Sequence, residues 1–164
     1  MRAVWFAKRL FLCGIRSFCC SSHAKTGNAR LQVNDGARLS LEDEAAINRT
    51  SAGAFYIKGS LAVEKDAVAS FTSVDDVHLN YDNAVADNGS IDVAAGSTLQ
   101  LSVNKLLSYG QAAINVAEKA TLDARGTDSL QLSNKTAVNL QKDARMMWQG
   151  IEFSNKGGMP TRPL

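Results

Sequence analysis

Residues 89–103 read GSIDVAAGSTLQLSV. Ile91 and Val93 alternate with polar residues, a short Ala-Ala-Gly interrupts the pattern, and the alternation resumes at Leu99 and Leu101. Successive side chains of a β-strand point to opposite faces, so this spacing places the apolar residues on one face. The stretch therefore predicts two short strands that are joined by a tight bend and share one buried face.

The same pattern occurs five times along the chain. Each copy has apolar residues at positions zero, plus two, plus eight and plus ten, and the copies begin at Leu31, Leu61, Ile91, Ile114 and Val138. Position plus six is always small: Ala37, Ala67, Ser97, Ala120 and Ala144. The copies are 30, 30, 23 and 24 residues apart. Self-similarity at this period is typical of stacked repeats, in which neighbouring units cover each other's apolar face.

The repeat favours a coil over a set of hairpins. The bends lack the Asn-Gly or Gly-Gly pairs of two-residue hairpin loops, and a hairpin does not require the same small residue five times. We therefore expect an all-β solenoid with parallel strands and about five to six coils. The plus-two residues Val33, Val63, Val93 and Val116 should then stack in one column.

A third side of each coil is less regular in sequence. Its candidates are FYIKG from Phe55, VHLNY from Val77, NKLLSY from Asn104 and LQL from Leu130. The 30-residue units are expected to carry loops around Glu42–Ser51 and Asp82–Asn88. An alternative interpretation makes Glu42–Ala46 and Asn104–Leu107 short helices.

The charge distribution separates the first residues from the rest of the chain. The net charge is +2, but six basic and no acidic residues precede position 31, which leaves twelve basic and sixteen acidic residues after it. Residues 1–28 are interpreted as a basic leader or a degenerate signal, with a weak interfacial helix as the alternative, because Lys8, Arg9 and Arg16 interrupt its apolar stretches. The β-helix is expected over 29–150 and a tail over 151–164. The mildly acidic body argues against a nucleic-acid partner.

Several stretches together resemble a known family. LQVNDGARLSLEDEA, GSIDVAAGSTLQLS and INVAEKATLDARG are similar to the coils of autotransporter passenger domains of the pertactin-like and IgA-protease-like kind. The resemblance covers roughly Ala29 to Trp148. It implies a single-stranded right-handed parallel β-helix of the pectin-lyase-like type, within a passenger at the surface of a Gram-negative bacterium. The tail is too short for the membrane barrel that ends such proteins, so the resemblance is to a fragment.

The sequence offers few groups for catalysis or metal binding. Its cysteines are Cys13, Cys19 and Cys20, and with His23 they match no common zinc spacing. Asp76 and His78 would share a face of a strand, as in an oriented base, but no nucleophile accompanies them. Carboxylates for sugar cleavage would come from Asp75, Asp76, Asp82, Asp87 and Asp92, with Tyr81 as the nearby aromatic residue. Phe71 and Trp148 fall on inward positions and are expected in the core.

We therefore expect no catalytic, cofactor-binding or metal site. The expected function is a structural or adhesive β-helix segment of a surface-exposed or secreted passenger, and a truncated product would be cytoplasmic. Expected partners are a host surface protein, a glycan, or a second copy bound through an open end, because no charged or proline-rich cap follows Trp148. The alternatives are a fragment of a carbohydrate-active β-helix enzyme or phage tailspike, and a non-functional remnant of a passenger gene.

Overall fold

Every regular element in the described part of the chain is a β-strand. The computed structural model describes residues 31–49, 54–73, 76–80 and 88–155, and the strands form three sheets, here named A, B and C. Sheet A contains, in spatial order, β1 (Leu31–Val33), β4 (Phe55–Ile57), β7 (Val77–Leu79), β10 (Lys105–Ser108) and β13 (Ser129–Gln131). Sheet B contains β2 (Arg38–Leu41), β5 (Ser60–Val63), β8 (Gly89–Val93), β11 (Ala112–Val116) and β14 (Thr136–Leu140). Sheet C contains β3 (Ala46–Arg49), β6 (Val68–Ser73), β9 (Thr98–Ser102), β12 (Thr121–Asp123), β15 (Arg145–Trp148) and β16 (Ile151–Ser154).

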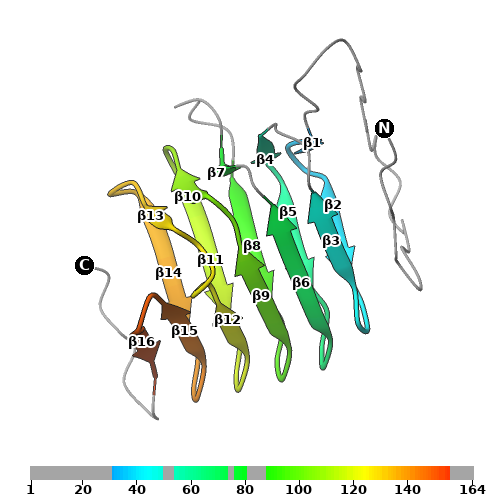
Figure 1. The fold of residues 1–164 in the computed structure, drawn as a ribbon, viewed down its shortest axis with the longest axis vertical. Helices are drawn as coiled ribbons and strands as arrows, with labels where there is room; N and C mark the ends of the chain where they lie inside the picture. Colours follow the sequence, from blue (N-terminus) through cyan, green and yellow to red (C-terminus); the bar gives the residue numbers. More distant parts are fainter. Residues whose placement is uncertain (1–30, 50–53, 74–75, 81–87, 156–164) are drawn as a thin grey trace.

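The chain winds through the sheets in the fixed order A, B, C. One such pass is a rung, and the rungs run from β1–β3 at one end to β13–β15 at the other (Figure 1). Strands of neighbouring rungs pair in parallel in all three sheets. The five rungs of the described residues make a β-solenoid of about four turns, and the expected all-β parallel β-helix is confirmed.

Inward side chains of successive rungs lie directly over one another. In sheet B one column is Leu39, Leu61, Ile91, Ile114 and Val138, and the next is Leu41, Val63, Val93, Val116 and Leu140. All are buried except the last member of each column, which is partly buried. Full burial of an aliphatic side chain contributes about 1.5–3 kcal/mol relative to exposure, so these columns are a main source of stability.

The first copy of the repeat occupies a different place from the one predicted. Val33 pairs with Ile57 in sheet A, and it is Leu41 that lies beside Val63 in sheet B. Val63, Val93 and Val116 do stack as expected. The expected column is therefore wrong at its first member.

A shared turn explains this displacement. In all five copies the N–H at plus six donates to the carbonyl at plus three over 3.0–3.1 Å, as from Ala37 to Asn34 and from Ser97 to Ala94. The plus-five residue has a positive φ every time: Gly36, Asp66, Gly96, Lys119 and Asp143. In the first copy this turn connects sheet A to sheet B, and in the later copies it connects sheet B to sheet C. The sequence repeat thus indicates where the turn occurs, but it does not indicate which two sheets the turn connects.

The third side is confirmed as sheet A, whereas two local expectations fail. FYI forms β4, VHL forms β7, and β10 lies within NKLLSY. Neither short helix exists: Glu42–Ala46 forms a bend that ends at the first residue of β3, and Asn104–Leu107 ends within β10, which begins at Lys105. The loop expected over Glu42–Ser51 contains β3, and most of the other expected loop, 82–87, lies outside the described residues. Sheet pairing with the next rung outweighs weak local helix preference here.

The end near Trp148 carries a cap that the sequence did not predict. After Gln149 and Gly150, the strand β16 returns antiparallel to β15, with Trp148 opposite Ile151 and Arg145 opposite Ser154. Asn155 then donates its backbone N–H to the carbonyl of Ala144 and its side-chain N–H to the carbonyl of Leu140. The edge of sheet C is therefore covered by residues that we had assigned to the tail.

The plus-five position provides a test of the turn. Gly96 has φ +72°, and an added Cβ would lie 2.5 Å from a carboxylate oxygen of Asp66. We expect Gly96→Ala to lower the free energy of unfolding by about 1–2 kcal/mol, because side chains disfavour this left-handed region. Lys119 has φ +58°, so Lys119→Gly should raise it by about 0.5 kcal/mol. Urea unfolding of both variants measures the two effects, and changes of the same sign would contradict the assignment.

Candidate functional site

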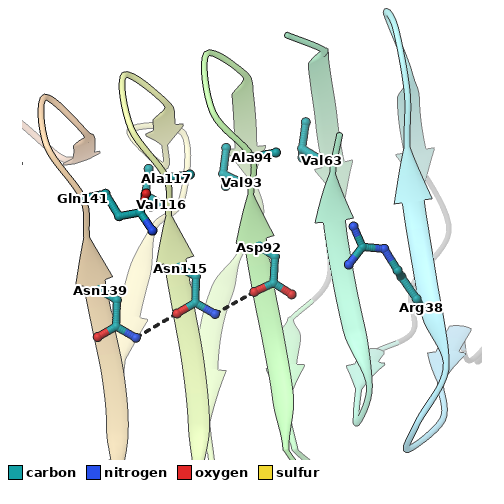
Figure 2. A pocket seen from close by; sticks show the side chains of 10 residues that line it. All are labelled: Arg38, Val63, Asp92, Val93, Ala94, Asn115, Val116, Ala117, Asn139 and Gln141. Atoms are coloured by element: carbon teal, nitrogen blue, oxygen red, sulfur yellow. Dashed lines mark hydrogen bonds between the residues drawn. The ribbon is translucent and has the colours of Figure 1, made fainter. Parts of the chain in front are cut away.

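A ladder of polar side chains runs along the outer face of sheet B. Asp92, Asn115 and Asn139 occupy the same position on β8, β11 and β14. Asn139 Nδ2 donates to Asn115 Oδ1 over 2.8 Å, and Asn115 Nδ2 donates to Asp92 Oδ1 over 2.6 Å (Figure 2). The ladder therefore has a direction, since each amide donates to the preceding rung and Asp92 accepts at its end.

Asp92 also accepts hydrogen bonds from two serines, one on its own strand β8 and one on β5 of the preceding rung. Its Oδ2 accepts from Ser60 Oγ over 2.5 Å and from Ser90 Oγ over 2.7 Å. Burial raises the pKa of Asp92, but the hydrogen bonds from Asn115, Ser60 and Ser90 and the charge of Arg38 outweigh it, so the pKa lies below its ordinary value. The site thus stabilises the carboxylate in its ionised form.

A shallow pocket of about 430 Å³ lies beside this ladder. It extends from Arg38 on β2 to Asn139 and Gln141 at the last rung, and Asp92 and Asn115 line its centre (Figure 2). At one end of the pocket, Arg38 of β2 reaches the next rung, where its Nη2 lies 2.7 Å from Oε1 of Glu64, the residue after β5. The hydrogen bond from Arg38 is the largest cause of the lowered pKa of Glu64.

A second pocket of about 500 Å³ lies on the outer face of sheet C. Hydroxyl and amide side chains of Ser70, Thr72, Gln100 and Ser102 line it. Asp123 and Arg125 also line it, and Arg125 donates to both carboxylate oxygens of Asp123 over 2.9 and 2.7 Å. The hydrogen bond from Arg125 is the main cause of the lowered pKa of Asp123.

The outer face of sheet A carries an aromatic stack. The rings of Tyr56 and His78 lie 4.9 Å apart at 27°, and those of His78 and Tyr109 lie 5.8 Å apart at 9°. These residues come from three successive rungs. The His78 ring therefore stacks with a tyrosine of the preceding rung and with a tyrosine of the following rung.

Asn80 bridges the corner between sheets A and B. It is buried and has φ +59°. Its Oδ1 accepts from the backbone N–H of Gly89 over 2.7 Å, and its Nδ2 donates to the carbonyls of Tyr109 and Gln111. These three bonds satisfy a buried amide and link two neighbouring rungs at this corner.

The carboxylates expected as catalytic candidates do not converge within the described residues. Asp76 accepts a hydrogen bond of 2.7 Å from Asn104 Nδ2, His78 lies in the aromatic stack, and Asp92 anchors the ladder of sheet B. The remaining candidates lie outside the described residues: Cys13, Cys19, Cys20, His23, Asp75, Tyr81, Asp82 and Asp87. Lowered pKa values at Asp92 and Asp123 are the opposite of what a general acid requires.

Two aromatic residues were expected in the core. Phe71 is fully buried and stacks on Phe55 with ring centroids 4.9 Å apart. Trp148 is only partly buried, because it lies in the last rung, and its Nε1 donates to the carbonyl of Thr127 over 3.1 Å. The core assignment is thus confirmed for Phe71.

The sequence contains signals for the polar ladder of sheet B and for the aromatic stack of sheet A, neither of which we predicted. The plus-one positions Asp92, Asn115 and Asn139 are polar and able to bond to one another, which indicates a ladder once their stacking is known. The middle residues of FYI and VHL similarly place Tyr56 beside His78.

Among the described residues there is no cluster of three potential metal ligands, and no helix is long and apolar enough to cross a membrane.

The ladder predicts a pH-dependent contribution to stability. Because the pKa of Asp92 is lower in the folded than in the unfolded chain, ionised Asp92 stabilises the fold above its ordinary pKa of about 3.9, and this contribution is lost as the pH falls through the lowered value. We expect Asp92→Asn to cost about 1–2 kcal/mol at pH 7 and progressively less towards pH 3. Urea unfolding at pH 7, 5 and 3 measures this, with exposed Asp128→Asn as the control. A cost independent of pH would contradict the role of the charge.

No family model, curated protein or solved structure matches the chain.

Proposed function

We propose that this chain is a non-catalytic structural segment of a surface-exposed or secreted stalk of the autotransporter passenger type, which serves display or adhesion. The observation that carries the proposal is that polar side chains on the outer faces bond to one another, both within a rung and between neighbouring rungs. Asp92, Glu64 and Asp123 are each engaged by side chains of the solenoid itself. Such groups strengthen a rod and hold no proton ready for transfer.

The shape of the fold supports the same proposal. Each rung contacts its neighbours through parallel strands in three sheets, so load applied along the sheets is shared by many backbone hydrogen bonds. The resemblance of the repeats to passenger coils supports the location at a cell surface. A host surface protein or a glycan is the proposed adhesive partner, and the polar pocket of sheet C is its proposed binding site.

Location and catalysis are tested separately. We expect antibodies against the chain to label intact cells of the source organism, or to detect it in the medium, and external protease should remove the label from cells. A cytosolic protein serves as the control for intact envelopes. Detection of the chain only inside the cytoplasm would contradict the proposed display.

A panel of acidic and neutral polysaccharides tests the enzyme alternative. We expect the purified chain to release no reducing ends and no unsaturated sugars. If activity is found, the variants Asp92→Asn and Asp123→Asn identify which outer face carries it, and the proposal of a non-catalytic segment is then wrong.

A further inference from the structure

The last strand, β16, occupies the place in sheet C that the strand of a sixth rung would take. Ile151 and Phe153 lie opposite Trp148 and Met146 in the antiparallel pair with β15. Cross-strand partners share a face of the sheet, and Met146 is buried in the interior, so Ile151 and Phe153 face inward as well. They are nevertheless 49% and 45% exposed. Sheet C thus continues one strand beyond sheets A and B in the described residues.

The neighbouring inward residues are also incompletely covered. Leu130, Val138 and Leu140 of the last rung are only partly buried, whereas their counterparts one rung earlier, Leu106, Ile114 and Val116, are fully buried. Ile151, Phe153 and these three residues are thus incompletely covered apolar side chains at the same end of the solenoid. An exposed apolar surface of this kind marks an interaction site.

The hydrogen-bonding direction of β16 follows from its hairpin. A two-residue turn with positive φ at both Gln149 and Gly150 makes Trp148 and Ile151 a hydrogen-bonded pair, and Asn155 at the other end donates to Ala144. Pairs alternate along an antiparallel ladder, so Ile151, Phe153 and Asn155 bond to β15. Glu152 and Ser154 therefore direct their backbone N–H and C=O groups to the outer edge. That edge has no strand beside it in the described part of sheet C.

We propose that a second copy of this chain pairs with this edge, β16 against β16 in antiparallel orientation, about a two-fold axis centred on Phe153. In this register Glu152 forms a hydrogen-bonded backbone pair with the partner's Ser154, and Ser154 with the partner's Glu152. Phe153 lies opposite the partner's Phe153 in a non-hydrogen-bonded pair, the closer of the two spacings. Both phenyl rings then face the apolar interior, and sheet C becomes continuous through the dimer.

Charge and shape favour this arrangement over its alternatives. A two-fold axis centred on Glu152 would place two carboxylates directly opposite, which is destabilising. A head-to-tail stack would bring β3 of a second copy to the place that β16 already occupies in sheet C. The self-complementary edge thus selects a closed dimer and blocks an open fibre. This proposal rests on β16 and is independent of the proposed function.

Oligomeric state provides the first test. We expect light scattering coupled to size exclusion to give the mass of a dimer for the full chain, and the mass of a monomer for Phe153→Lys. Val68 is 52% exposed on β6, away from this edge, so Val68→Lys is the matched control and should remain dimeric. A monomeric full chain, or a dimeric Phe153→Lys variant, would overturn the proposal. Circular dichroism confirms that each variant retains its strands.

Cross-linking tests the register. With Cys13, Cys19 and Cys20 changed to serine, Phe153→Cys should form a disulfide-linked dimer under mild oxidation, because Cα atoms of a non-hydrogen-bonded pair lie about 4.5 Å apart, within disulfide range. Val68→Cys in the same background is the control. We expect at least a tenfold larger cross-linked fraction for Phe153→Cys, and equal fractions would overturn the two-fold register.

Discussion

Each inward side chain of this protein is covered by a side chain of similar kind one rung away. No rung buries its apolar face alone, and the parallel backbone pairing that stacks the rungs also sets the register in which Ile91 meets Leu61 and Ile114. Stability is therefore shared between neighbours, and it is lowest where a neighbour is missing. Such a place is the last rung, where Val138 and Leu140 are only partly buried while their equivalents in the preceding rung are fully buried.

The outer faces follow the same rule with different chemistry. Identical strand positions in successive rungs place amide over amide in sheet B and ring over ring in sheet A. Asp92 ends the amide ladder because a carboxylate accepts from several donors at once, here Asn115, Ser60 and Ser90. The stacking that builds the core thus also sets which polar side chains bond to one another on the outer faces.

The parts of this structure that were predictable from the sequence are those that depend on spacing. Alternation around Ile91 and the small residue at plus six led to parallel stacked strands, which is the fold observed. The misplacement of Val33 has a physical reason: the same turn fits two different corners, so a repeat defined by the turn cannot say which sheets it joins. The left-handed conformation of Lys119 could not be predicted, because a lysine side chain gives no sign of it. β16 was missed because an antiparallel return breaks the repeat, and its function as a cap depends on contacts between strands.

The bond between Asn80 and Gly89 has a consequence for how the protein can change. It joins the two ends of the segment 81–87 over 2.7 Å, and Asn80 is held in turn by the carbonyls of Tyr109 and Gln111. Gly89 is required there, because a Cβ would lie 2.6 Å from Asn80 Oδ1. Asn80 and Gly89, on either side of this segment, are therefore held by hydrogen bonds to each other and to the next rung. Evolution, or an engineer grafting an epitope, can exchange the peptide between these two residues while the hydrogen bonds that carry the winding chain stay in place.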